Sequence, residues 1–475
     1  FMVSTTMHFM PGCEILQSFD LVHWEHVTYV YETLDHTDAQ QLKSGQNIYG
    51  QGMWAASLRY HEGRFYICFV ANDTRKTYLY TSEKIDGPWK KQLIEGFYHD
   101  GSLLFDEDGR NYIVYGNDEI WITELNEDLT APKKDGLHRL LVSDHKNPEL
   151  GYEGSHIQKI NGYYYIFLVH SLRDRWMRTE ACFYSDSLEG EFTGGDVLCD
   201  DRGYCGQGVA QGGIVDTPDG KWYAMLFQDS GAVGRIPILL PVTWKDHFPV
   251  FGQNGHVPEE IEVHSTRPGY IYQPLVGSDD FCNGLLPRWQ FNHDPDPRYY
   301  HLDALQGTYT ITTREVCTEL TQAVNTLTQR MSYPSCAAEV TVDASALKEG
   351  DVAGLCALQS CYAAVGITKH HGKYEVLMQD KKEDGILEMT EGTVVESHQM
   401  DFRLEADFCN MKDEARCYYR VNKGDWLPIG TVHKLYFKLD HFTGCRFGLF
   451  CYAAEETGGS ACFRDFKYYD VDEIS

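Results

Sequence analysis

Short apolar runs alternate with polar turns along the first 275 positions of the chain. Four of these runs share one pattern, in which a glycine-containing turn precedes a strand rich in aromatic and β-branched residues: HEGRFYICFVAND from His61, DEDGRNYIVYGND from Asp106, INGYYYIFLVH from Ile160 and TPDGKWYAMLFQD from Thr217. Such turns beside residues of high strand propensity predict β-hairpins. The turn glycines are separated by 46, 53 and 58 residues: Gly63, Gly109, Gly162 and Gly220.

The spacing of these hairpins predicts a β-propeller. Periods near fifty residues that contain only strands and turns are typical of propeller blades. Four clear copies and a shorter one at the opening FMVSTT predict five blades. A β-sandwich is the second interpretation, although its strands would follow one another at shorter and less regular intervals.

The pattern changes near residue 275. From residue 279 onward, alternating strands such as GTYTITT, CAAEVTVDA, KYEVLMQD and RFGLFCY follow at short intervals without the longer period. This pattern is typical of an antiparallel sandwich. We therefore predict an all-β chain, with a five-bladed β-propeller over 1–275 and a β-sandwich over 279–475.

Charge and cysteine content restrict the class of partner and the compartment. The 475 residues carry 70 Asp and Glu against 41 Lys and Arg, a formal net charge of −29 that would repel a nucleic-acid backbone. No apolar stretch reaches the roughly 18 residues that span a bilayer, so no membrane partner is expected. The 15 cysteines show no C-x-x-C pair or zinc spacing, which favours free thiols in a reducing cytoplasm. An extracellular location stays open, because the chain opens within a strand.

Two acidic residues occupy matching positions in successive repeats. Asp100 lies nine residues before Gly109, and Glu153 lies nine residues before Gly162. An arbitrary Asp or Glu is usually a solvated loop residue. Residues in register on neighbouring blades, however, converge on the central funnel of a propeller. Paired carboxylates in such a cavity suit acid–base chemistry on a glycosidic bond.

Several stretches of the chain resemble glycoside hydrolase family 43. HDGSLLFDEDGRNYIVYG and YEGSHIQKINGYYYIF are similar to its second- and third-blade motifs, and three further stretches match other parts of it: GMWAASLRYHEGRFYICF, PGCEILQSFDLVHWE and QGGIVDTPDGKWYAMLFQDSGAVGRIPILLPVTW. The C-terminal half resembles the β-sandwich of the xylosidase and arabinofuranosidase branches. The resemblance covers nearly the whole chain and implies an inverting mechanism with an aspartate base, an aspartate that tunes the acid, and a glutamate acid.

Carried over to this sequence, the resemblance makes Glu153 the general acid and Asp100 the tuning aspartate. We expect burial and a neighbouring negative charge to raise the pKa of Glu153, so that it can protonate the leaving oxygen. The family's base lies shortly before the stretch that matches FMVSTT, so we expect it upstream of Phe1, on about one short strand that precedes this sequence. No later aspartate matches it, and Asp20 is better explained by the turn DLVHW.

The resemblance also suggests supporting residues. Trp54 would be a sugar-stacking aromatic, with a position in the blade core equally open. Arg235, in GAVGRIP, would bond a sugar hydroxyl or act electrostatically on the two carboxylates. His156 would bond within the loop of the acid or satisfy backbone groups. Tyr163, Tyr164 and Tyr165 are better explained by strand packing.

Many family members hold a metal, often calcium, on the propeller axis with the help of a histidine from the fifth blade. In GVAQGGIVDT, Gln211 stands at that position. Calcium accepts a neutral amide oxygen, so a structural calcium ion held in part by Gln211 is expected.

The resemblance implies an exo-acting glycosidase that releases terminal pentose from an oligosaccharide substrate, with α-L-arabinofuranose of arabinoxylan-derived chains ahead of β-D-xylose. The alternatives are a β-xylosidase acting on xylo-oligosaccharides and a non-catalytic sugar-binding propeller. The missing base favours the binder, whereas the retained Asp100 and Glu153 argue against it. We expect the sandwich to buttress the propeller and consider that it closes one side of the pocket.

Overall fold

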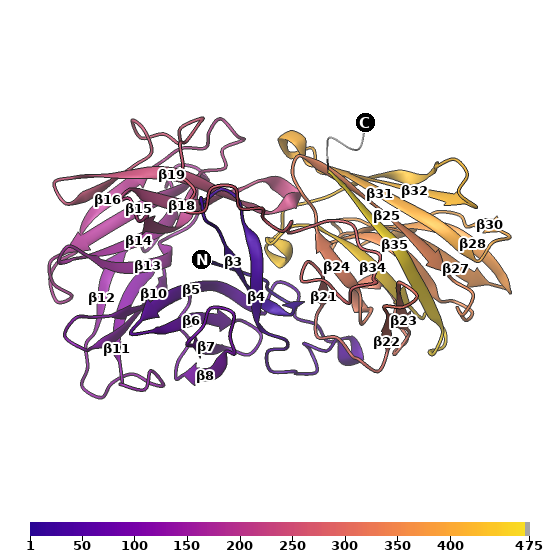
Figure 1. Ribbon diagram of the computed structural model, residues 1–475, viewed down its shortest axis with the longest axis horizontal. Coiled ribbons are helices and arrows are strands. Elements are labelled where there is room, and N and C mark those ends of the chain that lie inside the picture. The colour runs from indigo at the N-terminus through magenta and orange to yellow at the C-terminus, as the bar shows by residue number, and fades with distance from the viewer. Residues whose placement is uncertain (471–475) are drawn as a thin grey trace.

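The computed structural model describes residues 1–470 as two all-β domains that lie side by side (Figure 1). The N-terminal domain consists of five antiparallel sheets arranged in a ring, the five-bladed propeller that the repeats predict. In the order of these sheets, its strands are β1 (Met2–Ser4), β3 (Gly12–Gln17) and β4 (Glu25–Tyr31); β5 (Met53–His61), β6 (Arg64–Ala71), β7 (Lys76–Ser82) and β8 (Lys90–Ile94); β9 (Ser102–Phe105), β10 (Asn111–Asn117), β11 (Glu119–Leu125) and β12 (His138–Ser143); β13 (Glu153–Ile160), β14 (Tyr163–Ser171), β15 (Arg178–Ser185) and β16 (Thr193–Leu198); β17 (Ala210–Asp216), β18 (Trp222–Asp229), β19 (Arg235–Lys245) and β20 (Phe248–Phe251).

The repeated glycine turn joins the first two strands of each four-stranded sheet. The four turn glycines have φ angles of 80°, 81°, 86° and 79°, a left-handed conformation that glycine adopts without a Cβ clash. The two acidic motifs lie one sheet later in the propeller than the resemblance implies. The motif of Asp100 opens the third sheet and that of Glu153 opens the fourth, because the sheets β1–β3–β4 and β5–β8 both precede them.

The first sheet has three strands, whereas each of the other four has four. Its strand β1 lies against β5 of the next sheet, as the second strands β10 and β14 lie against β13 and β17. Likewise, β3 lies against β5 as the third strands β11 and β15 lie against β13 and β17. FMVSTT therefore holds the place of a second strand. The expected inner strand with its aspartate concerns residues before Phe1 and stays a prediction.

Neighbouring propeller sheets pack through the alternating apolar residues of their strands. Ile15 and Tyr31 of the first sheet, for example, form one buried cluster with Phe69 of the second. Tyr164 and Tyr165 are buried in the two clusters on either side of the fourth sheet, which explains the tyrosine run by strand packing. Because β-strand side chains alternate between faces, each blade can bury residues against both neighbours.

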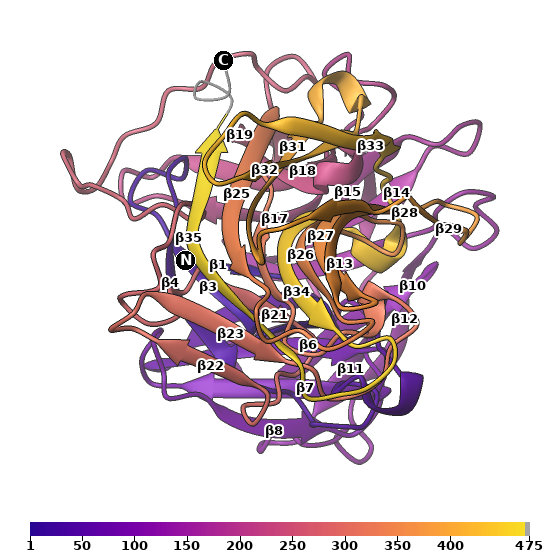
Figure 2. The ribbon, with the colours of Figure 1, turned by 90° about the vertical axis from the view of Figure 1, so that its right-hand side faces the viewer.

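The C-terminal domain is a sandwich of two antiparallel sheets, which faces the viewer in Figure 2. The nine-stranded sheet contains β2 (Phe9–Met10), β21 (Gln290–Asn292), β24 (Leu327–Arg330), β26 (Val352–Leu358), β27 (Ala363–His370), β28 (Lys373–Lys381), β29 (Leu387–Met389), β30 (Thr393–Val395) and β34 (Arg446–Tyr452). The seven-stranded sheet contains β22 (Tyr300–Asp303), β23 (Thr308–Thr312), β25 (Ser335–Asp343), β31 (Gln399–Asp407), β32 (Glu414–Val421), β33 (Leu427–Lys434) and β35 (Ser460–Asp470). The described helices are five short 3₁₀ turns: η1 (Lys43–Gly45), η2 (Gly231–Val233), η3 (Leu320–Gln322), η4 (Cys409–Met411) and η5 (Leu439–His441).

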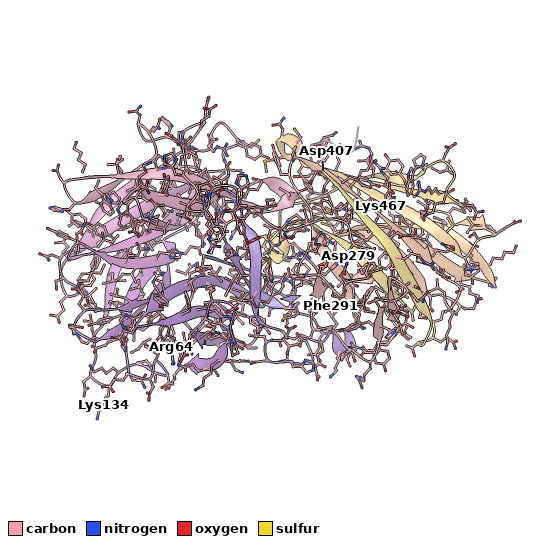
Figure 3. All side chains as sticks on the ribbon, viewed as in Figure 1. Arg64, Lys134, Asp279, Phe291, Asp407 and Lys467 are labelled. Atoms are coloured by element: carbon pink, nitrogen blue, oxygen red, sulfur yellow. The ribbon has the colours of Figure 1, made fainter. Side chains whose placement is uncertain are left out.

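One strand from the N-terminal region belongs to the sandwich. β2 leaves the first propeller sheet between β1 and β3 and pairs with β21, with Phe9 opposite Asn292 and Met10 opposite Phe291. Phe291 lies at the boundary of the two domains in Figure 3. A side-chain pair between Glu14 and Arg330, 2.9 Å apart, also crosses it. The domains are therefore tied together by a shared sheet as well as by the connecting segment, so loops of the sandwich can take fixed positions at the propeller.

The fifteen cysteines are free thiols, and ten of them are buried. This agrees with the interpretation drawn from their spacing, while the cytoplasmic location stays a prediction. No helix within residues 1–470 has the length and apolar character needed to cross a membrane.

Candidate active site

Asp100 and Glu153 meet where the third and fourth propeller sheets begin. The backbone N–H of Gly154 donates a hydrogen bond to Asp100 Oδ2 at 3.0 Å. The hydroxyl of Ser155 donates to the carbonyl of Asp100 at 2.7 Å. Asp100 is only 6% exposed. The shared offset of nine residues thus corresponds to a direct contact between the two motifs.

The glycine that follows Glu153 has a structural reason. Gly154 has a φ of 66°, and a Cβ at this position would lie 2.8 Å from Cγ of Gln211. The pairing of β13 with β14 is irregular between Glu153 and His156, which indicates a β-bulge. Bulges re-aim side chains at the ends of strands. The local sequence therefore directs the glutamate toward Asp100 and lets the fifth sheet approach closely.

His99 lies between the two carboxylates, and sequence reasoning missed it. Its Nε2 is 3.7 Å from Asp100 Oδ2 and 3.6 Å from Glu153 Oε2. Burial lowers the pKa of His99, but the charge of Asp100 and the close contact and charge of Glu153 outweigh it and raise the pKa to about 9. His99 therefore carries a proton at neutral pH. The available signal was its position directly before Asp100 in the motif YHDGS.

Two arginines whose charges act on Glu153 share one carboxylate, that of Asp229. Arg178 Nε lies 3.2 Å from Asp229 Oδ2, and Arg235 Nε donates to Asp229 Oδ1 at 3.2 Å. Burial alone would raise the pKa of Glu153. The close contact of His99 and the charges of Arg178, His99 and Arg235 outweigh burial and lower the pKa below its ordinary value.

The expected elevation of the Glu153 pKa is therefore wrong for the ligand-free site, because three cations surround this carboxylate. Asp100 shows the opposite shift. Burial raises its pKa to about 6, and the negative charge of Glu153 adds to the rise against the opposing charge of His99. Glu153 must gain a proton before it can act as an acid, and His99 is the neighbour that holds one at neutral pH. A side-chain amide of Asn117 donates to Glu153 Oε2 at 2.9 Å and fixes its orientation.

The sandwich contributes a side chain to this site. Phe442 follows η5, and its ring packs edge-on against that of Trp54 on β5, with centroids 5.5 Å apart. The guanidinium of Arg235 lies 4.3 Å from the centre of the same phenyl ring. Trp54 in turn lies 6.2 Å from the ring of His99. The structure therefore brings Trp54 and Arg235 to the carboxylate pair and adds Phe442, which no local sequence pattern connects with them.

His156 lies apart from the pair. A Cβ built on Gly213 of the fifth sheet would be 3.5 Å from its ring. Burial lowers its pKa to about 3, with a smaller effect of the Arg59 charge, so the imidazole is neutral. Within residues 1–470, no hydrogen bond joins His156 to Asp100 or Glu153.

The surroundings of Gln211 do not fit a calcium ion. Its side-chain oxygen accepts a hydrogen bond from Arg178 Nη1 at 3.2 Å, and its backbone N–H donates to Glu180 Oε2 at 2.8 Å. A divalent ion held about 4 Å from a guanidinium would be opposed by about 8 kcal/mol at an effective dielectric constant of 20. Glu180 is fully buried, and burial raises the pKa of this carboxyl well above the ordinary range.

Paired carboxylates beside an arginine and aromatic rings, as the propeller holds them, suit a carbohydrate ligand. The family model of glycosyl hydrolases family 43 matches residues 1–249, and that of the beta-xylosidase C-terminal concanavalin A-like domain matches residues 278–469. The chain belongs to glycoside hydrolase family 43 and is a glycosidase of that family.

Three relatives illustrate the similarity. A bifunctional GH43-CE protein of Bacteroides eggerthii is 41% identical over 98% of this chain, with a TM-score of 0.90, and this chain spans 60% of it. A GH43 hydrolase engineered for both endo-xylanase and exo-arabinofuranosidase activity is 27% identical, with a TM-score of 0.85 and 99% and 95% of the two chains covered. A β-xylosidase of Formosa agariphila is 25% identical over 99% of this chain and 86% of its own length.

Proposed function

We propose that the chain is an exo-acting, inverting glycosidase that releases terminal α-L-arabinofuranose from arabinoxylan-derived oligosaccharides. The observation that carries the exo preference is Phe442 of the sandwich, whose ring covers Trp54 and Arg235 beside the carboxylate pair. A site bounded on one side by a second domain suits the end of a sugar chain better than its middle. The relatives named as acting on xylosides and arabinofuranosides support a pentose substrate.

In this proposal, Glu153 protonates the leaving glycosidic oxygen. Asp100 holds the Gly154 amide and, as a nearby negative charge, makes the ionised form of Glu153 less favourable. Trp54 stacks on the sugar, and Arg235 donates to a hydroxyl. An inverting enzyme also needs a base that activates water from the opposite side of the ring. The aspartate expected upstream of Phe1 remains the prediction for that role.

Two alternatives use the same site. A β-xylosidase differs only in the pentose that is held, and the relative from F. agariphila bears that name. A non-catalytic sugar-binding propeller is the alternative from another class. Among the residues described around Glu153, no carboxylate is assigned to activate water, and this favours the sugar-binding alternative.

An assay panel tests the proposal. The 475-residue chain and a chain extended upstream by its native residues are compared on aryl α-L-arabinofuranoside, aryl β-D-xyloside and arabinoxylan oligosaccharides. Proton NMR reports the anomer that is released first. We expect inversion, a preference for arabinofuranoside and faster turnover by the longer chain. Retention of configuration would contradict the mechanism, and a preference for xyloside would contradict the substrate.

Glu153→Gln supplies the control for the acid. Loss of a general acid typically costs about 10²–10⁴-fold in rate. The loss should be smaller on aryl glycosides, whose leaving groups need less protonation. Sugar binding without turnover in every chain, including the longer one, would establish the binding-module alternative instead.

A further inference from the structure

The junction of the fourth and fifth sheets contains a buried cation that belongs to the chain itself. Arg178 opens β15, and its side chain is 5% exposed. Its guanidinium contacts Gln211 Oε1 at 3.2 Å and Asp229 Oδ2 at 3.2 Å. The centre of the Phe227 ring lies 5.4 Å from the guanidinium carbon of Arg178. A charge this deeply buried persists only when oxygen acceptors and an opposite charge surround it.

The charged groups around Glu153 already balance without an ion. On one side, His99 lies within 3.7 Å of both Asp100 and Glu153. On the other side, the two oxygens of Asp229 face two arginines. The groups that balance one another are therefore three cations, His99, Arg178 and Arg235, and three carboxyl groups, Asp100, Glu153 and Asp229. No excess negative charge is left among these six groups that would call for a divalent ion.

We propose that the guanidinium of Arg178 supplies, between the fourth and fifth sheets, the positive charge that a bound divalent ion would otherwise supply, so that this propeller keeps its site without a metal. Arg178 is a positioning residue in this role. Its contact with Gln211 reaches β17, the inner strand of the fifth sheet, and its contact with Asp229 reaches the end of β18. Gln211 then serves as an acceptor for the guanidinium and not as a calcium ligand.

The first test measures the unaltered protein. Purified 475-residue protein is analysed for bound metals, and its melting temperature is recorded with EDTA and with CaCl₂ at about 5 mM. A ligand that binds only the native state raises the melting temperature, and its removal lowers it. A site that holds no metal should therefore shift the melting temperature by less than about 1 °C with either EDTA or CaCl₂. We expect fewer than about 0.1 divalent ions per chain. Nearly one ion per chain, or a fall of several degrees on chelation, would overturn the proposal.

The second test removes the guanidinium. In Arg178→Ala, Gln211 Oε1 and Asp229 Oδ2 lose their cation, while Arg235 still pairs with Asp229 Oδ1, and we expect a lower melting temperature that guanidinium or calcium ions at about 5 mM partly restore. Arg59→Ala is the matched control. Arg59 is a half-buried arginine on β5 that donates only to backbone carbonyls, those of Leu58, Leu103 and Ile157, so added cations should not restore it.

If added cations restore the melting temperature of Arg178→Ala no more than that of Arg59→Ala, the Arg178 side chain acts by packing alone. This result would refute the charge argument. Arg178→Lys covers the case in which the alanine variant does not fold. It keeps the charge but loses the fork of donors, so we expect it to fold and to remain insensitive to EDTA. A lysine variant that requires calcium would overturn the proposal as well.

Discussion

Replacing His99 by asparagine should move the pH dependence of catalysis toward alkaline pH. His99 Nε2 lies 3.6 Å from Glu153 Oε2 and lowers the pKa of this carboxyl through its close contact and its charge. Two unit charges about 4 Å apart interact by about 4 kcal/mol at an effective dielectric constant of 20, which equals about 3 pKa units. Both side chains keep some solvent contact, 19% and 17% exposed, so we expect about 1–2 units after screening.

The sign follows from the role of Glu153 as an acid. Without the imidazolium its pKa rises, the carboxyl stays protonated to higher pH, and the alkaline limb of kcat/KM moves up by about 1–2 pH units. The assay is a pH–rate profile on an oligosaccharide substrate. His156→Asn is the matched control, because His156 is neutral at working pH and its loss removes no charge.

An alkaline limb that stays in place in His99→Asn, or that moves equally in His156→Asn, would refute this account of the site. Stability gives an independent readout. The folded pKa of His99 is about 9, above its ordinary 6.5, so its contribution to stability is complete below pH 6.5 and is lost as pH rises through 9. The shift corresponds to about 3 kcal/mol. Wild-type protein should therefore lose more unfolding free energy than His99→Asn between pH 6 and about 9.5.

Three further predictions follow from the same contacts. Asp100→Asn removes a negative charge beside Glu153, so the alkaline limb should move to lower pH as activity falls; an unmoved limb would leave Asp100 an orienting role alone. Gly154→Ala forces a side chain into a φ of 66° and against Gln211, so we expect a loss of about 1–3 kcal/mol in denaturant unfolding, and a neutral result would contradict the close approach. Phe442→Ala uncovers Trp54 and Arg235, so KM for pentosides should rise by about tenfold with little change in melting temperature, and an unchanged KM would place the ring outside the site.

The sequence determined the architecture to a large extent. Hairpins such as that of Gly109 are local features, because a left-handed glycine and alternating apolar residues need no distant partner to be recognised. Their fifty-residue period then predicted the propeller, and the loss of that period predicted the sandwich. The common offset of Asp100 and Glu153 placed the carboxylates in register, and the structure brings their motifs together.

The tertiary structure decided the electrostatics of the site. Arg178 belongs to none of the sequence motifs, and Phe442 comes from the other domain, so no pattern along the chain connects them with Glu153. The pKa of Glu153 depends on His99, Arg178 and Arg235, which is why the expectation from burial and the neighbouring negative charge had the wrong direction. The same contacts gave Gln211 a guanidinium as its partner. Strands, turns and register depend on residues that lie close together in the sequence. The charge balance of a buried site depends on side chains that only the folded chain brings within a few ångströms of one another.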